Sequence, residues 1–152
     1  MENEVLAKLA ERFPGLATDQ AVVKRHRVYL SVPNELLLEA LGYCKEMGFD
    51  HLCTITGLDN GAEFEFLYHI SNDQGLLLTL KRTAPYEEPV SIPTVLSIYE
   101  GATFYERELE GLLGIKVEGL PEGRQYPLPD NWPEGVYPLR KSWKPGQTNV
   151  TE

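Results

Sequence analysis

Cysteine, histidine and paired carboxylates are the residues of this chain that could support catalysis or metal binding. Cys44 and Cys53 lie nine residues apart, without a Cys-x-x-Cys pattern or a histidine at ligand spacing, which disfavours a zinc site or an iron–sulfur cluster. His51 lies two residues before Cys53, so a Cys–His nucleophile pair is conceivable, but the sequence shows no third group to orient it. The cysteines therefore predict no reactive centre.

Glu106 and Glu108 could act as a carboxylate pair only if their side chains converged. Residues two apart on a helix point in different directions, so acid–base chemistry of the glycosidase kind is not expected. The chain also lacks the glycine-rich patterns G-x-G-x-x-G and G-x-x-x-x-G-K-[ST] that bind dinucleotides and nucleoside triphosphates. We therefore predict no catalytic, cofactor-binding or metal-binding residue in this chain.

The stretch around Glu106 is predicted to form a short helix. Two capping-box patterns flank Gly101, so we expect a turn or two of helix before it and a second helix from about Thr103. Gly114 is placed to end that helix in a left-handed cap. The apolar residues follow a helical period of four, three, four and three; they are Ile98, Ala102, Tyr105, Leu109 and Leu112.

Four charged residues are left on the other faces of this helix: Glu106, Arg107, Glu108 and Glu110. Arg107 and Glu110 can pair, and Glu106 and Glu110 repel, each by about 0.2–0.5 kcal/mol. Local electrostatics therefore do not account for the cluster. It is either a solvated helix face or a surface made for another protein.

The preceding residues predict an α+β domain, with an antiparallel sheet and helices packed on one face of it. Strict alternation over 63–70 is the clearest strand pattern, and Asp59-Asn60-Gly61 before it is typical of a hairpin turn. The expected elements are a helix at 2–12, a strand at 22–32, a helix of about fifteen residues between Pro33 and Gly48, strands at 51–58, 63–70 and 76–82, and a loop at 86–93.

A change in composition predicts a boundary between a domain at 1–118 and an extended, proline-rich arm at 119–152. Six of the eleven prolines and both tryptophans lie in the arm, and proline disfavours helix and central strand. Aromatic side chains, each able to bury about 150–250 Å², are costly to leave in water. The arm is therefore either a clamp for a partner protein or a tail that wraps its own domain.

Net charge and hydropathy exclude several classes of partner. The formal net charge is −9, which disfavours nucleic acid and anionic lipid as direct ligands. The apolar runs are far shorter than the about 20 residues that a membrane helix needs. The start, Met1-Glu2-Asn3-Glu4, lacks the features of a secretory signal, and two cysteines are too few for a disulfide scaffold, so we expect a cytoplasmic location.

The motif helix and the arm together resemble the thirty-kilodalton subunit of respiratory complex I, also called the C subunit of NADH–quinone oxidoreductase. Two positions differ, because Gly111 stands where the family usually has Asp and Leu120 where it has His. These departures and the short length resemble a branch of the family, the small subunit of energy-converting membrane-bound hydrogenases. The matching residues are Tyr105–Glu108, Leu112–Ile115, Gly119, Pro121, Arg124, Leu128–Pro129, Trp132 and Pro138–Lys141.

The resemblance implies a non-redox accessory subunit of a complex-I-like, membrane-attached oxidoreductase. Its partners would be a large catalytic subunit, like that of nickel–iron hydrogenases or the forty-nine-kilodalton subunit, and a small iron–sulfur subunit. Those partners would hold the iron–sulfur clusters and the nickel–iron centre or quinone, while this chain would lie peripherally on the cytoplasmic side of the inner membrane. The implied interface residues are Glu106, Arg107, Glu108, Arg124, Trp132, Leu139, Arg140 and Lys141.

Three questions stay open from the sequence alone. The chain could instead be a stand-alone small-molecule binder or enzyme, with a pocket between the sheet and the motif helix. The sequence does not separate a hydrogenase from a quinone reductase. Gly111 costs a helix about 1 kcal/mol, so either close packing against a neighbour compensates or the helix ends early and Arg107 faces outward.

Overall fold

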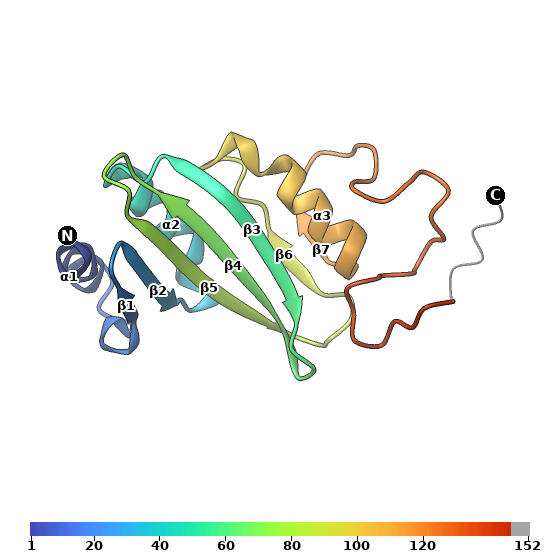
Figure 1. The fold of residues 1–152 in the computed structure, drawn as a ribbon, viewed down its shortest axis with the longest axis horizontal. Coiled ribbons are helices and arrows are strands. Elements are labelled where there is room, and N and C mark those ends of the chain that lie inside the picture. Colours follow the sequence, from blue (N-terminus) through green and yellow to red (C-terminus); the bar gives the residue numbers. More distant parts are fainter. Residues whose placement is uncertain (147–152) are drawn as a thin grey trace. The chain divides into compact units, whose positions relative to one another are not determined.

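The structure, a computed structural model, describes residues 1–146 (Figure 1). The end of the predicted arm, residues 147–152, lies outside the described residues. The helices are α1 (Glu2–Arg12), α2 (Leu37–Glu46) and α3 (Thr103–Leu113), with 3-10 turns at Thr18–Gln20, Asn34–Leu36 and Glu100–Ala102. The strands are β1 (Val22–Lys24), β2 (Arg27–Ser31), β3 (His51–Asp59), β4 (Glu63–Ser71), β5 (Leu77–Pro85), β6 (Ser91–Pro93) and β7 (Lys116–Glu118).

The chain divides into two compact units, one of residues 1–55 and 66–82 and the other of residues 56–65 and 83–152. We refer to them as the first and the second unit. Strands β3, β4 and β5 contribute residues to both. The predicted boundary between residues 118 and 119 stays a prediction.

The α+β class is confirmed, and the sheet is mixed. Its strand order is β1-β2-β5-β4-β3, so the three long strands form the predicted meander. Strand β2 pairs with β5 in parallel, with Leu30 opposite Leu80. Alternation of side chains reveals a strand but not the direction of its neighbour, which is why this pairing was not expected.

The predicted strand at 22–32 is wrong in one respect, because it is broken into the hairpin of β1 and β2. His26 adopts a left-handed backbone conformation with φ of 58° at the break. Its amide donates a hydrogen bond of 2.8 Å to the Glu2 carboxylate, and its carbonyl accepts one of 3.0 Å from the Leu77 amide. Contacts distant in sequence therefore hold a turn that lacks glycine or asparagine.

The core of the first unit combines α2 with the strands. The buried side of α2 is Leu37, Ala40, Leu41 and Cys44, and fully buried strand residues include Leu30, Leu78 and Leu80. The helix is shorter than expected, since residues 34–36 form a separate 3-10 turn. Gly48, with φ of 92°, follows its end as predicted.

In the second unit, α3 packs beside β7, which pairs in parallel with β6 (Figure 1). The helix begins at Thr103 as predicted, and the preceding turn is a 3-10 turn. Gly114 has φ of 68° and donates its amide to the Glu110 carbonyl at 3.0 Å, which confirms the left-handed cap. None of the helices within residues 1–146 has the length and apolar character that crossing a bilayer requires.

The buried face of α3, together with the 3-10 turn that precedes it, is rotated from the predicted buried face. It comprises Ala102, Glu106, Leu109 and Leu113, whereas the predicted Tyr105 and Leu112 are only half-buried. The charged residue Glu106 is thus on the inward side, and its contacts explain the rotation.

Candidate partner-docking surface on α3 and the C-terminal segment

Glu106 is anchored inside the second unit, with 1% of its surface exposed. Its carboxylate accepts hydrogen bonds from the Thr94 hydroxyl at 2.6 Å and the Val95 amide at 2.7 Å. Burial raises the pKa of this carboxyl above its usual value; the two hydrogen bonds lower it, and the charge of Glu110 raises it. The expected capping box is wrong, since no side chain caps the start of α3 and Glu106 binds residues 94–95 instead.

Arg107 points to the segment that follows β7. We call residues 119–146 the C-terminal segment; they contain neither helix nor strand. The Arg107 guanidinium donates to the Pro121 carbonyl at 2.6 Å. A Cβ on Gly123 would lie 2.4 Å from Nη2 of Arg107, so a larger residue here would require the guanidinium to shift.

Gly111 allows a second close crossing. A Cβ at this position would lie 2.9 Å from the carbonyl oxygen of Tyr126. The helix continues to Leu113, so it does not end early. Of the two explanations left open for Gly111, the structure supports close packing, and the neighbour is the chain's own C-terminal segment.

Arg140 fixes the far end of the segment to the end of α3. Its Nε donates to the Leu113 carbonyl at 2.6 Å and its Nη2 to the Gly114 carbonyl at 3.4 Å. It also pairs with Glu88, and its guanidinium lies 4.8 Å from the centre of the Tyr137 ring. A cation here interacts favourably with the negative end of the helix dipole and satisfies carbonyls that the helix leaves open.

The residues on either side of Arg140 are held as well. The Leu139 amide donates to the Leu112 carbonyl at 3.0 Å. The Lys141 amide donates to the buried Asp59 carboxylate at 2.8 Å, and its ammonium reaches the Asn60 carbonyl at 3.0 Å. For residues 139–141, the backbone therefore wraps its own unit, while 52% of the Leu139 surface stays exposed.

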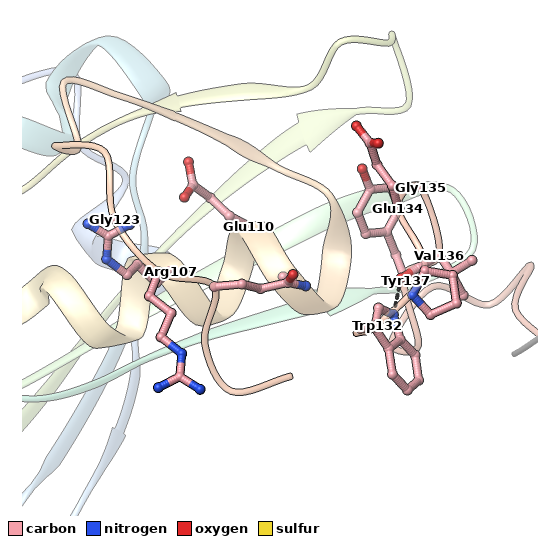
Figure 2. A pocket seen from close by; sticks show the side chains of 12 residues that line it. Arg107, Glu110, Gly123, Trp132, Glu134, Gly135, Val136 and Tyr137 are labelled. Atoms are coloured by element: carbon pink, nitrogen blue, oxygen red, sulfur yellow. Dashed lines mark hydrogen bonds between the residues drawn. The ribbon is translucent and has the colours of Figure 1, made fainter. Parts of the chain in front are cut away.

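Between α3 and the C-terminal segment lies an open cavity of about 310 Å³ (Figure 2). Figure 2 shows Arg107 and Gly123 toward one end and Trp132, Val136 and Tyr137 at the other. The Trp132 indole donates to the Val136 carbonyl at 2.8 Å, which shapes that end. The charged side chains in its walls include Arg107, Glu110, Arg124 and Glu134, so it offers ion pairs and hydrogen bonds to a polar ligand.

Two exposed aromatic rings lie on the outer side of this region. Phe104 on α3 is 63% exposed and Tyr126 on the C-terminal segment is 44% exposed. Their rings meet edge to face, with centroids 5.5 Å apart. We call this pair the aromatic step. Neither residue was among the predicted interface residues, although the position of Phe104 outside the apolar helical period was a signal that could have found it.

The other predicted interface residues are less engaged. Arg124 is exposed and makes two hydrogen bonds with Asp130, of 2.8 and 3.0 Å, which raise the pKa of the guanidinium. Glu108 and Trp132 are half-buried. Whether the eight predicted residues touch a partner stays a prediction; Glu106, Arg107, Arg140 and Lys141 all make contacts within the chain.

The cysteines do not provide a ligand set. Cys44 is fully buried, and burial raises the pKa of its thiol to about 12. Cys53 donates from its thiol to the Ser71 hydroxyl at 3.5 Å. Within residues 1–146, no group of three or more His, Cys, Asp or Glu side chains could hold a metal ion. That this chain holds no iron–sulfur cluster stays a prediction.

Comparison with known proteins gives consistent matches. The profile of the family described as "Respiratory-chain NADH dehydrogenase, 30 Kd subunit" matches residues 30–149. The C subunit of F(420)H(2) dehydrogenase from Methanosarcina mazei is 33% identical over 144 residues, which cover 92% of this chain and 90% of that one. The beta subunit of membrane-bound hydrogenase from Pyrococcus furiosus is 33% identical over 150 residues, covering 92% and 84%. A chain in the structure of the membrane-bound sulfane sulfur reductase, an archaeal respiratory membrane complex, superposes with a TM-score of 0.83 at 30% identity, covering 93% and 85%.

Proposed function

Because the chain belongs to the family of the 30 kDa subunit of respiratory-chain NADH dehydrogenase, we propose that it is a non-redox accessory subunit that docks the large catalytic subunit of a complex-I-like, membrane-attached oxidoreductase. Relatives from this family are subunits of complex-I-like and hydrogenase membrane complexes. The observation that supports docking is a C-terminal segment anchored to the middle of α3 through Arg107 and to its C-terminal end through Arg140, which holds the aromatic step at the surface.

The differing names of the relatives support an accessory role. F(420)H(2) dehydrogenase, membrane-bound hydrogenase and sulfane sulfur reductase act on different substrates, yet all contain a subunit similar to this chain. A shared subunit does not account for different chemistries, so the reacting centre belongs to other chains. We place the iron–sulfur clusters, and the nickel–iron centre or quinone, in the large catalytic subunit and a small iron–sulfur subunit. The membrane association is peripheral and made through these partners, on the cytoplasmic side of the inner membrane.

The aromatic step suits a protein partner better than a small molecule. Exposed aromatic residues close together are typical of interface anchors, because they bury much apolar area at little conformational cost. Phe104 lies on a helix and Tyr126 is held by the crossing at Gly111, so both rings are presented on fixed backbone. Neighbouring arginines at positions 107 and 124 add polar contacts at the rim.

Co-purification with an affinity-tagged large catalytic subunit tests this function. We expect Phe104→Glu to lower recovery of the chain at least about tenfold, because a charge would replace an apolar anchor of the proposed interface. Leu38→Glu is the matched control, since Leu38 is also an exposed apolar residue on a helix, in the first unit, and it should leave recovery unchanged. Circular dichroism of both variants checks that the fold persists. Recovery of Phe104→Glu at the wild-type level would refute docking through the aromatic step.

A further inference from the structure

The hairpin of β1 and β2 concentrates positive charge on an acidic protein. The run Lys24-Arg25-His26-Arg27 spans the turn, and all four residues are exposed, whereas the whole chain carries a net charge of −9. The first unit thus presents a basic surface that none of the contacts of α3 or the C-terminal segment uses.

Strand register places two of these cations on one face of the sheet. In the antiparallel hairpin, Val22 lies opposite Tyr29 and Lys24 opposite Arg27. Because residues two apart in a strand point to the same side, these four side chains share a face. The parallel pairing of β2 with β5 adds Leu77 beside Arg27 and Thr79 beside Tyr29.

These side chains enclose an open groove of about 460 Å³ within the first unit. The opposite face of the same strands is the core, where Val28 and Leu30 are buried. The groove has an apolar floor with two cations and no carboxylate in its walls. Its lining residues are Val22, Lys24, Arg27, Val28, Tyr29, His69, Leu77 and Thr79.

The groove borders a free sheet edge. In the sheet formed by the described residues 1–146, strand β1 is the last in the order, so one side of its backbone has no neighbouring strand there. Val22 and Val23 expose 53% and 44% of their surface there. Exposed edge strands of this kind accept extended peptide segments, which add backbone hydrogen bonds to side-chain contacts.

We propose that the groove beside β1 binds an extended, acidic segment of a neighbouring protein chain. Carboxylates of that segment pair with Lys24 and Arg27, and its apolar side chains cover Val22 and Leu77. Charge complementarity identifies the occupant, because the lysine and arginine are joined by no carboxylate among the described residues that line the groove, and an apolar floor disfavours a purely polar ligand. The strongly negative chain as a whole would be repelled by an anionic membrane, which favours a protein segment over lipid.

This inference rests on the proposed function only in expecting the segment to belong to another subunit of the complex. It uses residues of the first unit, whereas the docking test uses Phe104 in the second. The two tests are therefore independent, and a negative result in one does not decide the other.

Fluorescence anisotropy with the purified full-length chain tests the groove. The probe is a labelled decapeptide of alternating Glu and Val, compared with the same peptide carrying Lys in place of Glu. We expect only the acidic peptide to bind, and Arg27→Glu to weaken it at least about tenfold with steep dependence on salt. Val22→Ser, at an exposed position, should weaken it about two- to fivefold because apolar contact is lost.

Arg25→Glu is the matched control, because it makes the same charge change at an exposed turn position outside the groove. It should weaken the peptide less than about threefold, through long-range charge alone. Equal binding of the two peptides, or equal effects of Arg25→Glu and Arg27→Glu, would overturn the proposal. A third outcome would also overturn it: the acidic peptide does not bind, but vesicles of phosphatidylcholine and phosphatidylglycerol bind the chain in a way that depends on Arg27. The groove would then be a lipid site.

Discussion

Removing the Arg140 side chain should release the end of the C-terminal segment from α3 while leaving both units folded. The Arg140 side chain is 17% exposed. Its guanidinium contacts the Leu113 and Gly114 carbonyls, Glu88 and the Tyr137 ring. Arg140→Ala removes all of these contacts at once. Its effect should be largely local, because the guanidinium contacts a core side chain only through the ring of Phe64, 5.3 Å from its centre, and leaves that ring in place.

The size of the effect follows from the individual contacts. A hydrogen bond from a charged donor contributes about 1.5–3 kcal/mol, and a cation at a helix end about 0.3–1 kcal/mol. Stacking on Tyr137 adds about 0.5–1 kcal/mol, and the ion pair with the exposed Glu88 about 0–1 kcal/mol. Contacts of one side chain are not additive, so we expect a loss of about 2–4 kcal/mol in the free energy that closes the segment.

Amide hydrogen exchange measures this free energy directly. The amides of Leu139 and Lys141 are bonded to the Leu112 carbonyl and the Asp59 carboxylate, and they exchange only when the segment opens. A loss of about 2–4 kcal/mol predicts exchange about 30- to 700-fold faster at both amides. Arg140→Lys should give an intermediate rate, because it keeps the charge but loses the planar fork.

Arg124→Ala is the control for this measurement, since Arg124 lies in the same segment but is exposed and forms its ion pair with Asp130, within the segment itself. It should leave the Leu139 and Lys141 amides unchanged. If Arg140→Ala altered their exchange by less than about threefold, the guanidinium would not be what closes the segment.

Three further predictions concern the helix, a buried acid and the thiols. Gly111→Ala should lower the free energy of unfolding, measured by urea titration, by about 1–3 kcal/mol, because the new Cβ would collide with the Tyr126 carbonyl. The gain in helix propensity, about 1 kcal/mol, offsets this loss only in part. An increase in stability would contradict the close crossing of the C-terminal segment at Gly111. The raised pKa of Glu106 means that the folded state holds its proton more tightly than the unfolded state, so this group's contribution to stability is complete below the usual carboxyl pKa and declines as the pH rises through the folded pKa. The stability lost in Glu106→Gln should therefore be smaller at pH 7 than at pH 4, and a loss that grows with pH would refute the assignment. Iodoacetamide at pH 8 should modify Cys53 but not Cys44 in the native chain, because the Cys44 thiol is buried and has a pKa of about 12. Mass spectrometry should therefore find one labelled thiol in the native chain and two in the urea-unfolded chain.

Local patterns in the sequence predicted much of the fold. The alternation over 63–70 fixed β4, and the glycines at 48 and 114 marked helix ends, because both depend on conformational preferences of neighbouring residues. The break at His26 and the parallel pairing of β2 with β5 were missed, since both depend on partners distant in sequence.

The candidate site shows the same limit. A glutamate among charged residues is normally placed on the solvent side, but Glu106 is buried because Thr94 and Val95 satisfy its carboxylate. Arg140 and Lys141 were expected to face a partner, and the sequence offered no sign that a helix end and a hairpin turn would bind them. Phe104 alone could have been found from its position outside the apolar helical period, but its pairing with Tyr126 depends on the course of the C-terminal segment.

The anchoring of residues 139–141 has a consequence for the assembly pathway. Ordering a disordered tail costs about 1–2 kcal/mol of backbone entropy per residue, and a tail that orders only on association subtracts this cost from the affinity. Here the cost for residues 139–141 is met when the chain folds, so this stretch is already ordered when a partner binds. Its association should then proceed in a single kinetic phase, without a slower phase of coupled folding.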